Sequence, residues 1–310
     1  MAVYTPVLEA MLKQGKAPDI FYLPSYSYSQ KLYDAGYLEP LNDLSGLTEN
    51  FSPEALSPWQ TEDGVSYGVP FTAVSHGIYY NINIFKRYHL SIPKTWPEFL
   101  QTADTLQKEG ITPLANASGE NWPMAELVFM SLVPNFIGGQ EGRLAYLNGD
   151  RCFNDEHIID TFQAVKDISA FFPKNQKYLK YSDSLQLFLQ GKTAMWLSAS
   201  WDIPFLEEQS PNFEWGVFAV PPLAGQPGYI TFHPDAGIGV NTASSHKQEA
   251  LLFLEWMTTS EFAELLANEL PGFFSLNKNM IFPDDLHARE FLDLSSGREK
   301  DVRFAWQKIS

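Results

Sequence analysis

Tyr67-Gly68-Val69-Pro70-Phe71, followed by Gly77-Ile78-Tyr79-Tyr80-Asn81 and then Pro93-Lys94-Thr95-Trp96-Pro97-Glu98-Phe99, is the most informative stretch of this sequence. Its apolar runs predict strands over 65–72 and 77–82. Thr95 and Glu98 have the spacing of a capping box, and Pro97 suits a first helical turn, where its missing N–H costs nothing. The stretch therefore predicts strand, crossover and helix in close succession.

The same signals extend in both directions from this stretch. Further strands are predicted over 18–23, 193–197 and 215–220, and helices over 158–171 and 185–190. Ser245 and Gln248 form a second predicted capping box, opening a helix that runs to Met257. Strands that alternate with helices predict an α/β fold with parallel sheets covered on both faces.

Length and composition limit the architecture and the partners. At 310 residues, 45% of them hydrophobic, the chain fits one very large domain or two ordinary ones. No segment is apolar over the ~20 residues of a membrane span. The net charge of −16 argues against nucleic acid and anionic membranes as partners. No long linker separates two halves, so two domains would share interleaved crossings.

The aromatic, cysteine and histidine content favours ligand binding over metal or redox chemistry. The chain has 8 Trp, 14 Tyr and 23 Phe, enough to fill a core and leave flat faces for a ligand. Its one cysteine, Cys152, cannot form an intrachain disulfide and is expected to be small and half-buried. No Cys/His cluster has metal spacing, so neither a metal nor another cofactor is predicted.

Several segments, in order along the chain, resemble those of extracellular solute-binding proteins (family 1) of ABC transporters, of the maltose-binding type. They are Gly15-Lys16-Ala17-Pro18-Asp19-Ile20-Phe21, residues 34–41, 67–71, 80–81, 188–195 with Ser200-Trp201, 234–241 and 270–274. Any one of these matches is weak, but their common order along the chain makes the resemblance specific.

The resemblance implies a periplasmic-binding-protein-like fold of type II, with two α/β lobes, interleaved chain crossings and a hinge. Lobe 1 would comprise residues 1–75 plus 236–268, and lobe 2 residues 76–235 plus 269–310. It implies a monomeric, non-enzymatic, extracytoplasmic component of an importer, periplasmic or anchored as a lipoprotein. This component would capture a carbohydrate, an oligosaccharide or glycoside, and deliver it to a membrane permease.

The chain departs from the family pattern at both ends. Family members open with a signal segment, a strand and a helix, whereas here Met1-Ala2-Val3-Tyr4 leads directly into an amphipathic helix. The sequence therefore reads as shortened at both ends, and we expect lobe 1 to lack one edge.

The resemblance and the chemistry of sugars select the same kinds of residue for the cleft. A sugar offers apolar C–H faces and many hydroxyls, so aromatic platforms and polar groups are needed. Trp201 matches the tryptophan that stacks on sugar in the family, and Trp122 is a candidate second platform; core packing is the alternative for each. Trp306 is a looser third candidate, while Trp59 and Trp96 are predicted to be structural.

The polar candidates lie in loops and on the predicted crossings. Ser25 and Tyr26 follow the 18–23 strand, where an ordinary loop is the alternative. Ser75 and His76 lie on the first crossing, and His76 has a structural role as its alternative. The other candidates are His233 and Asp235 on the return crossing, which could instead be a rigid hinge, and Gly272 and Phe273, where glycine would allow close approach to a hydroxyl.

Two other functional classes compete with solute binding. A glycoside hydrolase needs two carboxylates ~5–10 Å apart, but Glu207-Glu208 and Asp284-Asp285 read as solvated charges, and no GxSxG, HExxH or P-loop pattern occurs. A structural or interaction protein would use exposed aromatics as a partner surface. Binding without chemistry remains the reading that the motifs favour.

Overall fold

The computed structural model of this chain describes residues 4–279 and 282–301. Its strands are β1 (Ile20–Pro24), β2 (Val69–Asn81), β3 (Thr112–Leu114), β4 (Thr193–Ala199), β5 (Trp215–Phe218), β6 (Tyr229–Val240) and β7 (Glu299–Asp301). Its helices are α1 (Tyr4–Lys13), α2 (Ser27–Asp34), α3 (Leu47–Asn50), α4 (Pro53–Leu56), α5 (Ile82–Arg87), α6 (Trp96–Lys108), α7 (Met130–Ile137), α8 (Gly139–Leu147), α9 (Glu156–Ser169), α10 (Tyr181–Leu189), α11 (Ile203–Gln209), α12 (Lys247–Met257), α13 (Ser260–Glu269) and α14 (Leu286–Asp293). Short 3-10 turns are η1 (Ser57–Trp59), η3 (Gln176–Tyr178) and η4 (Ser200–Asp202), and η2 (Pro123–Phe129) is a π-helical segment.

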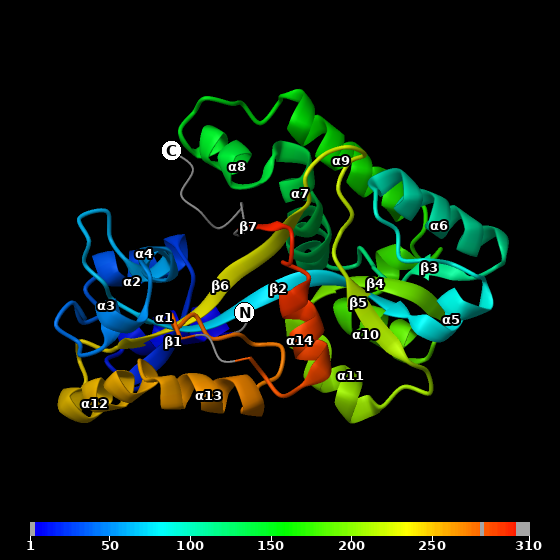
Figure 1. The fold of residues 1–310 in the computed structure, drawn as a ribbon. Coiled ribbons are helices and arrows are strands. Elements are labelled where there is room, and N and C mark those ends of the chain that lie inside the picture. Colours follow the sequence, from blue (N-terminus) through cyan, green and yellow to red (C-terminus); the bar gives the residue numbers. More distant parts are fainter. Residues whose placement is uncertain (1–3, 280–281, 302–310) are drawn as a thin grey trace.

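The two longest strands, β2 and β6, connect the two halves of the molecule. The first part of β2, through Ser75, pairs antiparallel with β6, whereas the part from His76 onward pairs with β4 and β5. Figure 1 shows β2 and β6 side by side between the blue and orange elements on one side and the green elements on the other. The chain leaves the first half along β2 and returns along β6.

Each half has its own apolar core. In the first half, buried side chains from α1–α4, β1 and α12 pack around the near ends of β2 and β6; they include Leu8, Leu23, Leu47, Trp59, Val69, Val240 and Leu254. In the second half, two larger clusters cover the far end of β2 together with β3, β4 and β5; they include Ile78, Tyr79, Phe99, Leu114, Phe188, Trp196 and Phe291. The α/β fold with crossing strands that the resemblance implied is therefore present.

The prediction of parallel sheets is wrong, because most of the strand pairs in the described residues are antiparallel. Strand order is β1-β6-β2-β4-β3, with β5 on β2 and β7 on β6. Only β3–β4 and β6–β7 are parallel among the strands of the described residues. The reason is topological: β2 and β6 are the outward and return connections between the halves, so they run in opposite directions and pair antiparallel with each other.

The two strands predicted over 65–72 and 77–82 are one continuous strand. Register shifts between Pro70 and Thr72 and between Thr72 and Ala73 mark an irregularity in β2. The small and polar residues beyond it carry no strand signal of their own. At Gly77 an added Cβ would lie 2.7 Å from a methyl carbon of Val217, so the strand passes close to β5 there.

Three local predictions need correction. Thr95 accepts the Glu98 N–H as predicted, but the Glu98 carboxylate accepts from the Lys94 N–H, one residue before the N-cap. The capping box predicted for Ser245 is absent: the helix starts at Lys247, and His246 is its N-cap without a side-chain cap hydrogen bond. The His246 N–H donates to the Ser244 hydroxyl. Cys152 is exposed rather than half-buried.

Candidate functional site

Two histidines meet on the paired strands β2 and β6, which connect the two halves. His76 and His233 are 2% and 0% exposed, and their Nε2 atoms lie 3.3 Å apart. On the far sides of the two rings, His76 Nδ1 lies 2.8 Å from Ser131 Oγ and His233 Nδ1 lies 3.1 Å from the Pro234 carbonyl oxygen. The predicted residues of the two crossings are thus joined directly, at the junction of the two halves.

Trp201 lies beside this histidine pair. Its ring is edge-on to His76, with centroids 6.0 Å apart, and its Nε1–H donates to the Tyr181 hydroxyl at 2.8 Å. Tyr181 also contacts the second predicted tryptophan, Trp122, with ring centroids 4.7 Å apart. Trp201 is half-buried and Trp122 is 41% exposed, so both rings keep surface that core packing does not use.

Asp202, which the sequence analysis did not select, lies behind Trp201. Its side chain is fully buried and accepts hydrogen bonds from the Tyr181 hydroxyl and the Ser198 hydroxyl, both at 2.5 Å. Burial raises the pKa of Asp202 to about 7, and the two hydroxyl hydrogen bonds oppose that rise. The only signal in the sequence was its position directly after Trp201.

Gly272 and Ser75 meet at Ser200. The Ser200 hydroxyl donates to the Gly272 carbonyl oxygen at 2.5 Å and accepts from the Ser75 N–H at 3.1 Å. Gly272 has φ +89°, and an added Cβ would lie 2.0 Å from the Ser200 carbonyl oxygen. The glycine therefore allows the close approach of two backbone segments here. Phe273, the next residue, is half-buried.

Three further predicted residues, Ser25, Tyr26 and Asp235, lie on or directly after β1 and β6. Tyr26 has a positive φ of 68°, which is uncommon for a residue other than glycine, and its N–H donates to the Pro58 carbonyl oxygen at 2.9 Å. Ser25 is buried, and its hydroxyl has no hydrogen-bond partner in the part of the chain that the structure describes. Asp235 is half-buried, and its carbonyl oxygen accepts from the Tyr22 hydroxyl at 3.5 Å.

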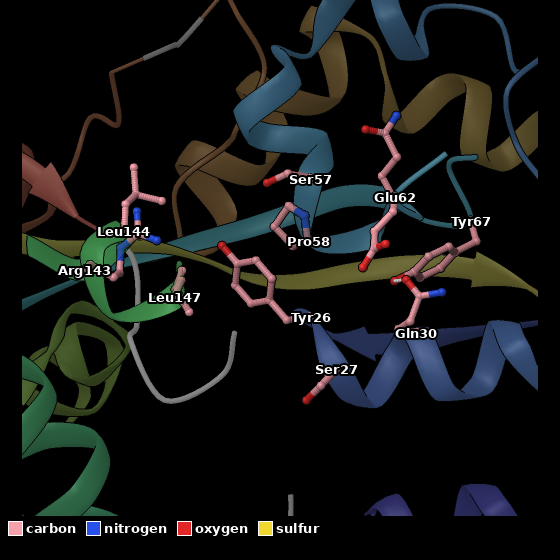
Figure 2. A pocket seen from close by; sticks show the side chains of 11 residues that line it. Tyr26, Ser27, Gln30, Ser57, Pro58, Glu62, Tyr67, Arg143, Leu144 and Leu147 are labelled. Carbon is pink, nitrogen blue, oxygen red and sulfur yellow. Dashed lines mark hydrogen bonds between the residues drawn. The ribbon is translucent and has the colours of Figure 1, made fainter. Parts of the chain in front are cut away.

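Tyr26 opens on a cavity of about 300 Å³ between α2 and η1 of one half and α8 of the other. Figure 2 shows its ring between the α8 side chains and the residues of the first half. Polar and aromatic groups in the lining include Tyr26, Gln30, Gln60, Glu62, Tyr67 and Arg143. Of these, only Tyr26 was predicted, because the others come from separate segments without a recognisable motif.

Arg143 brings a paired charge to this cavity. Its Nε donates to the Asp301 carboxylate at 2.6 Å, and both side chains are nearly fully buried. The Asp301 carboxylate neutralises the charge of this guanidinium, so Arg143 does not favour an anionic ligand in the cavity.

A separate acidic cluster lies away from the crossing, between α11 and α14. Glu207, Asp285 and His287 bring ligand atoms within 4.8 Å of one another. Burial, together with a hydrogen bond and repulsion from Asp285, raises the pKa of Glu207 to about 7. The reading of all four acids as solvated is therefore wrong for Glu207 and Asp285, which are half-buried, and fits Glu208 and Asp284, which are exposed.

Three remaining observations concern membrane spans and the other predicted tryptophans. Among the described residues, no helix combines the length and the hydropathy that crossing a membrane requires. The predicted third aromatic, Trp306, lies outside the described residues. Trp59 and Trp96 are 0% and 6% exposed, as expected for structural tryptophans.

Two α/β halves joined by opposed crossing strands, with a cavity between them, define a two-lobed binding protein of the periplasmic type II fold. Residues 2–264 match the family model described as bacterial extracellular solute-binding protein. The chain belongs to this family.

Individual relatives agree with this assignment. The multiple sugar-binding protein of Streptococcus mutans is 28% identical over 268 residues, which cover 82% of this chain and 61% of that relative. The solved structure of the solute-binding protein RafE in complex with raffinose is 26% identical, with a TM-score of 0.79, over 97% of this chain and 79% of that one. A chitin oligosaccharide binding protein, 23% identical with a TM-score of 0.79 over 97% of this chain and 77% of that one, shares the fold. The chain thus spans about three fifths of the length of the Streptococcus mutans relative.

Proposed function

We propose that this protein is the substrate-binding component of an ABC importer, which captures a neutral oligosaccharide or glycoside between its lobes. The lobes would be residues 1–75 plus 236–268 and residues 76–235 plus 269–310. The protein would act as an extracytoplasmic monomer and deliver its ligand to a membrane permease. Hinge motion about β2 and β6 would close the cleft.

The arrangement at the crossing is the observation that carries this proposal. Trp201 lies beside the His76–His233 pair, and Trp122 is linked to Trp201 through Tyr181; both tryptophan rings are partly exposed. Aromatic faces pack on the C–H surfaces of a sugar, and hydroxyl and amide groups bond its hydroxyls. Ser25, Tyr26, Ser75, Asp235, Gly272 and Phe273 complete the proposed site.

Charge in the cavity favours a neutral ligand over a phosphate or carboxylate. Arg143 is paired with Asp301, and Glu62 adds a negative charge to the lining. Two relatives, the multiple sugar-binding protein of Streptococcus mutans and RafE in complex with raffinose, support a carbohydrate ligand.

The test is a thermal-shift screen of the whole chain against raffinose, stachyose, maltose, xylotriose, chitobiose and glycerol 3-phosphate. A ligand present at 100 times its Kd should add about 2.7 kcal/mol to the free energy of unfolding. A shift with a sugar and none with glycerol 3-phosphate is expected. A well-folded sample that responds to none of the sugars, or only to glycerol 3-phosphate, would refute the carbohydrate assignment.

The same samples distinguish binding from glycoside hydrolysis. After prolonged incubation, each sugar should be recovered intact by chromatography, because a binding protein cleaves no bond. Product sugars that disappear when the purified protein is omitted, and whose amount scales with its concentration, would favour the hydrolase instead.

A further inference from the structure

Three side chains form a one-directional hydrogen-bond series behind the proposed binding face. The Trp201 Nε1–H donates to Tyr181 Oη at 2.8 Å, and the Tyr181 O–H donates to Asp202 Oδ1 at 2.5 Å. The second carboxylate oxygen, Oδ2, accepts from the Ser198 hydroxyl at 2.5 Å. An indole N–H can only donate and an ionised carboxylate can only accept, so the direction of every bond is determined.

The series links elements that are distant in the sequence. Tyr181 begins α10, Ser198 lies near the end of β4, and Trp201 and Asp202 belong to η4. Tyr181 is also wedged between Trp122 and Trp196, with ring centroids 4.7 and 5.7 Å away. Its hydroxyl is therefore held in place from both sides, and the position of the Trp201 nitrogen depends on it.

We infer that Asp202 and Tyr181 are positioning residues, which set the orientation of the Trp201 ring toward its ligand through the series Trp201–Tyr181–Asp202. This inference rests on the proposed function for the importance of Trp201, but the hydrogen-bond series itself does not require a ligand. Neither residue contacts the ligand in this scheme. Asp202 acts through Tyr181, and Tyr181 acts through the indole N–H.

Protonation of Asp202 would change the direction of the series. The acid form carries a proton that must be donated, and the neighbouring oxygens are those of Tyr181 and Ser198. If Tyr181 Oη accepts from both Trp201 and Asp202, its own proton loses its acceptor, and the site has one donor too many. Because burial raises the pKa of Asp202 to about 7, this change falls near neutral pH.

The other titratable groups that face this series come from neighbouring elements. Tyr181 from α10 and Tyr79 from β2 have pKa values raised well above 10 by burial and by the charge of Asp202, so both stay neutral near pH 7. His76 on β2 contacts the Trp201 ring. Glu207 of α11 acts on Tyr79 by its charge. A test must therefore separate Asp202 from His76.

The indole N–H signals of protein labelled with ¹⁵N-tryptophan provide such a test without any ligand. The Trp201 signal is assigned from its loss in Trp201→Phe, and spectra are recorded between about pH 5 and pH 9. We expect the Trp201 signal to move in one titration in the wild type and to lose that titration in Asp202→Asn, which keeps His76. In Tyr181→Phe we expect the signal to move to the position of an indole without its acceptor.

Trp59 is the matched internal control. Its Nε1–H donates to the carbonyl oxygens of Leu23 and Pro24, both at 3.2 Å, and no titratable side chain takes part in those bonds. Its signal should be unchanged in every variant, which also reports that the fold is intact. A Trp201 titration that persists in Asp202→Asn, or a Trp201 signal that is unchanged in Tyr181→Phe, would overturn the inference.

A binding measurement separates this inference from the proposed function. Calorimetry of raffinose and the other panel sugars at about pH 8 should show Kd raised about fivefold in Tyr181→Phe, the effect of losing roughly one hydrogen bond. An unchanged Kd beside an altered Trp201 signal would remove the positioning role. If the wild type binds no sugar, the proposed function fails, and the spectra alone decide whether the series exists.

Discussion

The buried carboxylate of Asp202 should leave a signature in the pH dependence of stability. Asp202→Asn removes the ionisable group and keeps a side chain of similar shape. In the folded chain burial raises the pKa of Asp202 from 3.8 to about 7, whereas in the unfolded chain it stays near 3.8. Between these two pH values the folded chain holds a proton that the unfolded chain has lost.

The sign and size of the effect follow from linkage. Because the folded state binds more protons, the free energy of unfolding falls as pH rises from about 4 to about 7 and is level above that. Each unit of pKa difference corresponds to about 1.36 kcal/mol, so the difference between 3.8 and about 7 corresponds to about 4 kcal/mol. The asparagine side chain of the variant does not titrate and has no such dependence. The stability of the variant minus that of the wild type should therefore increase by about 4 kcal/mol between about pH 4 and pH 8.

Urea unfolding at constant ionic strength, followed by circular dichroism and tryptophan fluorescence together, measures this difference at several pH values. Glu207, whose pKa is also raised to about 7, is present in both proteins and cancels in the comparison. A stability difference that is independent of pH, or one that decreases toward pH 8, would refute the argument that Asp202 is held near neutrality by burial.

Three further substitutions test separate parts of the structure. Trp201→Ala should weaken sugar binding by ~1–3 kcal/mol in calorimetry, from the loss of a stacking face, while the melting temperature stays close to that of the wild type; unchanged affinity would remove Trp201 from the site. Gly272→Ala should lower the melting temperature, because the new Cβ would lie 2.0 Å from the Ser200 carbonyl oxygen at φ +89°, and an unchanged value would contradict that close approach. Arg143→Met should reduce the free energy of unfolding by ~3–5 kcal/mol in urea, because it leaves the Asp301 carboxylate buried without its guanidinium; a cost below ~1 kcal/mol would mean that water reaches Asp301.

The segments predicted to connect the two lobes carry local sequence signals, and they can be compared with the two long strands. The run through Tyr67–Phe71 and Tyr80–Asn81 and the return around Pro234 both fall on or beside the two long strands that join the halves. The direction in which strands pair carries no local signal. An alternation of apolar residues has the same period in a parallel and an antiparallel sheet, so the general rule for α/β proteins led to the wrong pairing for β2 and β6.

The candidate site likewise contains residues that the sequence indicated and residues that it did not. His76, His233 and Trp201 were selected from separate motifs, and the structure brings them together. Tyr181 and Asp202 were missed because their role depends on a contact between α10 and η4 that no spacing predicts. An aspartate that follows an aromatic residue in a loop reads as a solvated charge. Only the fold shows that it is buried with two hydroxyl donors.

Burial and hydrogen bonding together distinguish Trp59, a core residue, from Trp201, the proposed ligand platform, better than either property alone. Trp59 is fully buried, and its N–H donates to backbone carbonyls, which cannot move without disturbing β1. Trp201 is half-buried, and its N–H donates to a side-chain hydroxyl that is itself held by a titratable group. A ring fixed by backbone serves only the fold. A ring fixed by a side-chain series can be reoriented by substitution or protonation within that series, which suits the proposed role of Trp201 at a binding face.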